Sequence, residues 1–219
     1  MSFRLMLAPV ALAALAMSSS AHATFTVYTT QASFLAAISA PGVDTFNDLD
    51  FTAPLASPQN RTAGAYSYAA SAGPISNFFP AGNAADVWLA TNNRTDTITF
   101  SNFTSTVTGV GGFFFRADTN GLSTTTAATL TVTATDASGT VSQTLVNPGV
   151  TTFLGFVSNG PITSLSVFVG TQGVGTVGVW PTVNDLTMGV AAVPEPSTYA
   201  LLIGGLAVLG AAVRRARTS

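Results

Sequence analysis

The side chains that could carry chemistry in this chain are almost entirely carboxylates, hydroxyls and aromatic rings. The sequence has no Cys, its one His is His22, and all seven of its cationic residues are Arg. Its single Glu is Glu195. Beyond residue 23, thiol, imidazole and Schiff-base chemistry therefore have no residues to use.

Two Asp side chains would be enough for a glycoside hydrolase, which pairs one carboxylic acid with one carboxylate. The pairs that the sequence offers are Asp86 with Asp96 and Asp48 with Asp185. Nothing in the spacing of either pair marks it as catalytic. We therefore expect that the chain is not an enzyme, and an Asp-dependent glycoside hydrolase is the catalytic alternative.

The densest group of oxygen ligands consists of Asp44, Asp48 and Asp50, with Asn47 between them. Asp185 lies in the last expected strand, and the first and last strands of a jelly roll are often neighbours. These four carboxylates are candidate ligands of a hard cation such as Ca²⁺, which takes about six to eight oxygens. Since the sequence supplies fewer, solvated carboxylates at strand ends are the alternative.

Aromatic residues offer a second kind of site. Sugar rings stack on the faces of large aromatic side chains, so a carbohydrate-binding platform is one interpretation. The other is that these residues pack in the core, because large aromatics dominate the interiors of β-sandwiches. The candidates are Tyr66, Tyr68, Trp88 and Trp180.

The composition predicts an exported all-β protein. Only 7% of the residues are charged and 47% are hydrophobic, whereas about a quarter of an ordinary domain is charged. Thr, Ser, Asn and Gly replace the charges and favour strands and turns. Outside the two ends the only cations are Arg61, Arg94 and Arg116, so no basic patch for nucleic acid is expected.

Residues 1–23 have the three parts of a secretory signal peptide. Arg4 supplies the positive region, an apolar stretch follows, and Ala21 and Ala23 form an A-x-A cleavage site. We expect signal peptidase to cut after Ala23. The mature chain would then begin at Thr24.

Residues 24–190 are predicted to form one all-β domain. At 128–135, apolar residues alternate with Thr, and a turn at 136–139 leads into a second strand at 140–146. About ten short strands with regular turn signals favour an antiparallel β-sandwich of the jelly-roll type. A short helix that Thr30 can cap precedes them. A closed barrel is the alternative.

Residues 191–219 form a tail with three parts. A Pro-Glu-Pro element breaks the chain, an apolar stretch at 199–213 predicts a transmembrane helix, and a cationic cluster follows. The stretch is shorter than the roughly 20 residues that span a bilayer, but flanking Arg side chains can snorkel. The positive-inside rule keeps the cluster in the cytoplasm. Its members are Arg214, Arg215 and Arg217.

This tail, which begins Val-Pro-Glu-Pro-Ser-Thr at Val193, resembles the PEP-CTERM sorting signal in all three parts. The resemblance implies that an exosortase, a membrane cysteine peptidase of Gram-negative bacteria, recognises Pro194, Glu195 and Pro196 and removes the tail. The protein would be held transiently in the inner membrane and then passed to the cell surface or extracellular matrix. Exopolysaccharide is the implied partner there. An ordinary C-terminal anchor is the alternative.

Together these features favour a non-enzymatic surface or matrix protein. Its domain would have a structural or adhesive role in exopolysaccharide or biofilm. A carbohydrate-binding, lectin-like module is the second interpretation.

Overall fold

The computed structural model describes residues 25–126, 128–170, 172, 177–192 and 202–206. The signal peptide, the Pro-Glu-Pro element and the Arg cluster lie outside these residues, and the predictions made for them stay predictions. Of the predicted transmembrane stretch, residues 202–206 are described, and they are helical. Among all the described residues, no helix has the length and apolar character needed to cross a membrane.

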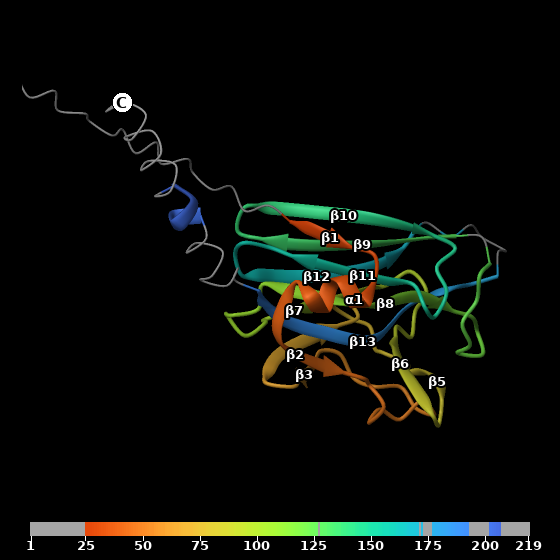
Figure 1. Cartoon of the computed structure of the whole chain (residues 1–219). Coiled ribbons are helices and arrows are strands. Elements are labelled where there is room, and N and C mark those ends of the chain that lie inside the picture. Colours follow the sequence, from red (N-terminus) through yellow and green to blue (C-terminus); the bar gives the residue numbers. More distant parts are fainter. Residues whose placement is uncertain (1–24, 127, 171, 173–176, 193–201, 207–219) are drawn as a thin grey trace, which may run out of the picture.

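Two antiparallel sheets pack face to face around one main core (Figure 1). In order across the first sheet lie β1 (Thr26–Tyr28), β11 (Phe153–Val157), β8 (Gly109–Ala117), β13 (Trp180–Ala191), β6 (Asp86–Ala90) and β5 (Ala81–Asn83). β2 (Ile38–Asp44) also pairs with β13. Across the second sheet lie β10 (Gly139–Val146), β9 (Thr129–Asp136), β12 (Ile162–Val169), β7 (Thr97–Ser101), β4 (Tyr66–Ser71) and β3 (Gln59–Ala63). The prediction of an all-β antiparallel fold is confirmed.

The period-two pattern produces β9 and β10 as predicted. Leu130 and Val132 are fully buried, while the Thr residues between them face the other side of the sheet. The turn between the strands is held by the Asp136 carboxylate, which accepts hydrogen bonds from the backbone N–H groups of Ser138 at 2.7 Å and Gly139 at 3.1 Å. This local capping explains why a short polar sequence reverses the chain here.

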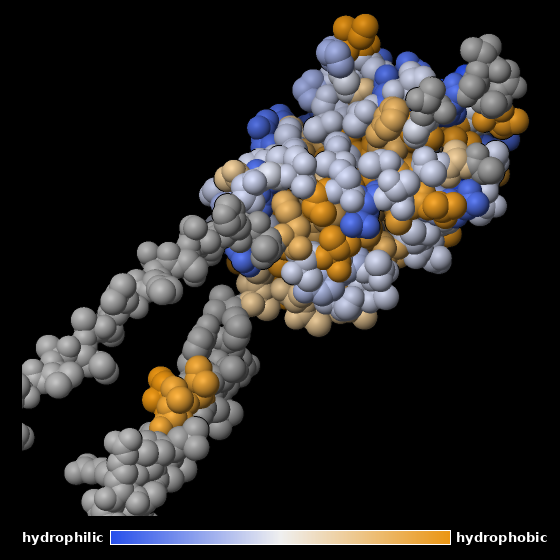
Figure 2. Space-filling model, turned by 90° about the horizontal axis from the view of Figure 1, so that it is seen from above, coloured by the Kyte–Doolittle hydropathy of each residue, from blue (hydrophilic) through white to orange (hydrophobic). Residues whose placement is uncertain are grey.

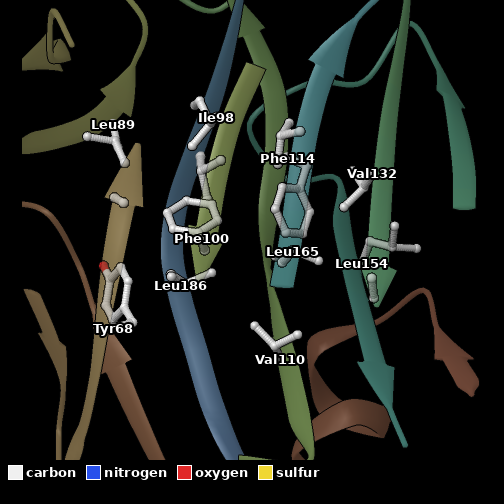
Figure 3. Close-up of a cluster of buried hydrophobic side chains, with 14 of the residues drawn as sticks. Tyr68, Leu89, Ile98, Phe100, Val110, Phe114, Val132, Leu154, Leu165 and Leu186 are labelled. Atoms are coloured by element: carbon white, nitrogen blue, oxygen red, sulfur yellow. The ribbon is translucent and has the colours of Figure 1, made fainter. Parts of the chain in front are cut away.

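The core between the sheets is built from aromatic and aliphatic side chains. Phe100 and Leu165 come from the second sheet, Phe114 and Leu186 from the first, and all are fully buried (Figure 3). Since the chain has no Cys, no disulfide supports this packing. Burial of apolar surface must therefore supply most of the stability.

The outer face of the first sheet is also partly covered. The short helix α1 (Gln31–Ala36) begins where the Thr30 side chain accepts a hydrogen bond from the backbone N–H of Ser33 at 3.3 Å. Phe34 of this helix is fully buried, and its ring lies 5.6 Å from that of Phe153. The second sheet carries no such cover in the described residues, so the two outer faces differ in chemistry.

The two sheets approach each other closely where β2 passes β3. A Cβ on Gly42 would lie 2.1 Å from the carbonyl oxygen of Ala63, and a Cβ on Gly64 would lie 2.9 Å from the Cα of Gly42. Gly64 also has a φ of 59°, which side chains disfavour. Only glycine permits this crossing, and the crossing places Asp44 of β2 beside Arg61 of β3.

Replacing Gly42 with Ala should therefore destabilise the fold. The new methyl group must displace backbone, so we expect a loss of about 2 kcal/mol in the free energy of unfolding, measured in urea. Gly160→Ala is the matched control, because a Cβ there meets nothing within 4 Å. Equal unfolding midpoints for the two variants would contradict the proposed role of this contact.

Candidate functional site

The most strongly connected polar group lies at this crossing of the sheets. It is called the Arg61 cluster here and consists of Asp44, Asp48, Arg61 and Tyr68. Arg61 donates from Nε to Asp44 Oδ2 at 2.7 Å and from Nη2 to Asp44 Oδ1 at 2.8 Å, a bidentate pair. It also donates from Nη2 to Asp48 Oδ1 at 2.7 Å and from Nη1 to Asp48 Oδ2 at 3.3 Å.

Further contacts surround the Asp44 carboxylate, whose side chain is only 5% exposed. Tyr68 Oη donates to Asp44 Oδ2 at 2.7 Å, and the backbone N–H of Phe46 donates to Asp44 Oδ1 at 3.0 Å. The Arg61 guanidinium lies 5.2 Å above the Phe46 ring. The buried charge is thus paired and hydrogen-bonded, which is the condition for burying it at tolerable cost.

Burial and the hydrogen bonds of the cluster shift the pKa values of Arg61, Tyr68 and Asp48. Burial works against the charge of Arg61, but the hydrogen bonds to Asp44 and Asp48 outweigh it and raise the pKa of the guanidinium. Burial, together with the charge of Asp44, raises the pKa of Tyr68. The hydrogen bond from Arg61 lowers the pKa of Asp48. Because its pKa is raised, Tyr68 keeps its proton at neutral pH and donates it in the hydrogen bond to Asp44.

The carboxylates predicted as Ca²⁺ ligands are not gathered around one point. Asp44 and Asp48 do converge, but on the Arg61 guanidinium. Asp50 accepts from the backbone N–H of Thr52 at 2.8 Å, and Asp185 lies near Asp86. In the parts of the chain that the structure describes, no group of three or more acidic or His side chains could hold a metal ion. The sequence showed the carboxylates but not that an Arg would meet two of them.

The first strand, β1, pairs with β11 and not with the last strand, β13, so the expected pairing of the first and last strands is wrong. The strand that contains Asp44 is the second one, β2, and it does pair with β13. β2 lies beside β13 with Asp44 opposite Leu186. Leu186 is buried in the core, and the strand is irregular between Asn184 and Thr187, with Asp185 at a φ of 50°. The charge that acts on Asp185 is that of Asp86 and not that of Asp44.

The Asp pairs considered for acid–base catalysis have other partners. Asp86 accepts from Trp88 Nε1 at 2.9 Å and from Asn184 Nδ2 at 3.0 Å. Asp96 accepts from the Ser76 hydroxyl. The carboxylate that does lie near Asp86 is Asp185, whose pKa is raised by burial and by the charge of Asp86. No local pattern could reveal this pair, since the two residues are far apart in the sequence.

The four aromatic residues predicted as a sugar platform do not share one surface. Tyr66, Tyr68 and Trp88 are buried, and each uses its polar atom within the fold. Tyr66 Oη donates to the Ala40 carbonyl at 2.8 Å, and the Trp88 ring packs edge-on against Phe115 at 4.9 Å. These three residues therefore lie in the hydrophobic core clusters. Trp180 is only half-buried.

Trp180 lines a cavity of about 380 Å³ at one end of the outer face of the first sheet, called the Trp180 pocket here. Small residues form part of its lining, among them Ala90 and Ala117. Phe51 and Phe79 add aromatic surface. The polar lining residues include Asn92, Asp118 and Asn120. Sequence reasoning found Trp180 but none of these neighbours.

The outer face of the second sheet carries ordered hydroxyl groups, and we call it the hydroxyl face. Cross-strand register aligns one row of hydroxyl side chains over five adjacent strands. The row consists of Ser142, Thr133, Ser166, Thr99 and Ser71. A second row consists of Thr140, Thr135, Ser164 and Ser101. Neighbouring strands lie about 4.8 Å apart, so the hydroxyls form a regular array.

This array carries no charge. The outward positions of β10, β9, β12, β7 and β4 contain no Asp, Glu, Lys or Arg. Figure 2, which views the molecule from above and not onto this face, shows a mostly pale surface with scattered blue and orange patches. Since the sequence pattern placed Thr on one side of each strand, it showed the composition of this face but not the alignment of its rows.

Removing Arg61 should destabilise the protein far more than removing Asp48. Arg61→Met leaves the Asp44 carboxylate buried without a cation, so we expect a loss of about 3 kcal/mol in the free energy of unfolding in urea. Asp48→Asn is the control, because its side chain is 70% exposed and an exposed pair contributes less than about 1 kcal/mol. Equal losses for the two variants would show that burial of the pair is not what matters.

Comparison with known proteins finds similarity at the C-terminus. Residues 192–217 match the family described as the PEP-CTERM protein-sorting motif. No curated protein matches the chain significantly. The matched residues begin directly after β13 and include the Pro-Glu-Pro element and the Arg cluster. The chain therefore carries a PEP-CTERM protein-sorting motif, which indicates an exported protein that is targeted to an exosortase for delivery to the cell surface or beyond.

Proposed function

We propose that the β-sandwich is a non-catalytic surface or matrix module with a structural or adhesive role in exopolysaccharide or biofilm. The observation that carries this proposal is the hydroxyl face: an ordered, uncharged array on a domain whose last strand leads directly into the sorting motif. In this proposal signal peptidase first removes residues 1–23. The apolar stretch at 199–213 then holds the protein in the inner membrane until the exosortase acts.

The chemistry of the hydroxyl face suits contact with a polyol polymer. Each hydroxyl group can both donate and accept a hydrogen bond, as sugar hydroxyls do. Replacing one hydrogen bond to water by one hydrogen bond to a sugar contributes little to the binding free energy, about 1 kcal/mol. Many weak contacts along one polymer add up, because the second and later contacts form at high effective concentration. A face of this kind supports adhesion rather than recognition of one small molecule.

The use of the acidic side chains supports a role without catalysis. Asp44 and Asp48 bind Arg61, and Asp136 caps the hairpin turn. Burial acts to raise the pKa of Asp136, but hydrogen bonds from Ser138 and Ser158 outweigh burial and lower the pKa overall. Carboxylates that are fixed by structural contacts in this way stabilise the fold and are poorly suited to transfer protons.

Charges placed on the hydroxyl face should weaken attachment to the matrix. The triple variant with Thr99, Thr133 and Ser166 each changed to Lys interrupts the longest row, and desolvating three cations against a neutral polymer is unfavourable. We expect a several-fold lower share of the protein in the exopolysaccharide fraction of the producing cells, measured by immunoblot, with export unchanged.

The matched control changes Thr29, Ser105 and Thr151 to Lys, since these residues are exposed and lie outside that face. It adds the same net charge and should leave retention as in the wild type. If both triple variants are retained like the wild type, the hydroxyl face does not hold the protein in the matrix. If both are lost equally, net charge is responsible.

Changing Pro194, Glu195 and Pro196 together to Ala should block sorting. The change removes the recognition element and lets the helix extend toward the domain, but leaves the apolar length and the Arg cluster intact. We expect the variant to be exported and folded, yet to remain in the membrane fraction with its tail attached. Fractionation and mass spectrometry of the C-terminus measure this.

The control for this experiment deletes residues 199–219, which should release soluble protein without any processing. Processing of the triple-Ala variant at the wild-type rate would mean that the tail serves only as an anchor. Because the hydroxyl face is unchanged in both variants, this outcome does not depend on the retention experiment.

A further inference from the structure

We propose that the Trp180 pocket binds an uncharged pyranose unit of a neutral polysaccharide. The inference deepens the proposed matrix role, because it names a ligand class and a specific site. The volume of the pocket, about 380 Å³, lies within the range of about 300 to 1,000 Å³ for small-molecule sites. Its lining combines apolar rings with a few polar groups, which is the usual composition of such a site.

The pocket arises where strands of the first sheet end or begin together. β6 ends at Ala90, β8 ends at Ala117, and β13 begins at Trp180. Ala90 and Ala117 present only methyl groups there, so the outer face of the sheet is hollow at this point. Farther along the same face, large rings such as Phe115 and Trp88 fill the space.

The aromatic side chains of the pocket leave apolar surface open to solvent. Phe79 is 37% exposed, and Trp180 is half-buried. The Trp180 ring is held in place by a hydrogen bond from its Nε1 to the carbonyl of Asn92 at 3.3 Å. One face of a pyranose ring carries C–H groups, and such a face packs well on an aromatic surface whose orientation is already fixed.

The polar side of the pocket is rigid as well. Asp118 Oδ1 accepts from the backbone N–H groups of Asn120 at 2.8 Å and Leu122 at 3.0 Å, which closes a tight loop. The backbone N–H of Gly82 donates to the carbonyl of Gly121 at 2.9 Å and ties this loop to β5. Asp118 Oδ2 accepts no hydrogen bond from the described residues and is available to a ligand hydroxyl.

The charges of the pocket select among sugars. Asp118 is its one charged lining residue among those the structure describes, and it is an anion. A uronic acid or a sulfated sugar would place a second negative charge beside it, whereas neutral hydroxyls donate to it favourably. The side-chain amides of Asn92 and Asn120, which are both exposed, can donate to and accept from ring hydroxyls. The geometry therefore favours neutral over anionic glycans.

The test measures binding of defined oligosaccharides to the purified full-length chain by its tryptophan fluorescence. The chain has two Trp, and Trp88 is buried while Trp180 lines the pocket, so a ligand in the pocket should change the signal of Trp180. Maltohexaose and cellohexaose are the neutral probes, and hexagalacturonate is the anionic one. We expect at least one neutral probe to bind with a Kd on the order of 1 mM or lower, and hexagalacturonate to bind at least tenfold more weakly.

Two variants and one control locate the site. Phe79→Ala and Asp118→Ala should each weaken binding of the neutral probe about tenfold, and unfolding in urea verifies that they fold. Phe168→Ala is the matched control, because Phe168 is a partly exposed aromatic on the hydroxyl face, and it should bind like the wild type. Unchanged binding by both pocket variants, or equal binding of hexagalacturonate, overturns the proposal.

The proposal is also overturned if no neutral probe binds at concentrations up to about tenfold above the expected Kd of about 1 mM. That result leaves the adhesive role intact, because matrix retention is measured in cells with variants of the other sheet. Loss of binding in Phe168→Ala alone would place the glycan on the hydroxyl face, supporting the adhesive role and rejecting the pocket.

Discussion

The buried ion pair between Arg61 and Asp44 is the interaction on which the arrangement of the two sheets depends. Asp44 ends β2, which pairs with β13 in the first sheet, and Arg61 lies in β3 of the second. The bidentate pair thus ties the sheets together at one corner, where Gly42 and Gly64 allow the backbones to approach. Two unpaired charges in this position would each cost several kcal/mol, so the corner is stable only when both strands are in place.

Arg116 shows what burial of a cation costs without an anionic partner. It is fully buried, its Nη1 donates to the carbonyls of Thr126 and Ala128, and its Nε and Nη2 have no hydrogen-bond partner among the described residues. Burial lowers the pKa of Arg116. The carboxylates of Asp44 and Asp48, by contrast, raise the pKa of Arg61. A buried Arg therefore stabilises the fold at position 61 and destabilises it at position 116, because, of the two, only Arg61 has carboxylates beside it among the described residues.

The two outer faces of the sandwich follow from what covers each sheet. The outer face of the first sheet is covered by α1, by the Trp88 side chain and by the loop after β8, which explains its aromatic character. The face has a hollow where the large side chains are replaced by Ala90 and Ala117. The second sheet has no such cover in the described residues, so most of its outward positions are polar, and most of these are hydroxyls because the chain has few charged residues. Phe168 and Val146 are apolar exceptions. The proposed glycan pocket and the hydroxyl face thus lie on different sheets of the sandwich.

The sequence by itself determined the features that depend on neighbouring residues: the alternation in β9, the turn capped by Asp136, the helix capped by Thr30, and the sorting tail. These are local, because backbone periodicity, capping and a linear motif are complete within a few residues. Only the tertiary structure decided that Asp44 meets Arg61, that Asp86 lies near Asp185, and that Trp180 joins Phe79 in a pocket. Those partners come from strands far apart in the chain, and their meeting depends on strand order and register, which no short segment encodes.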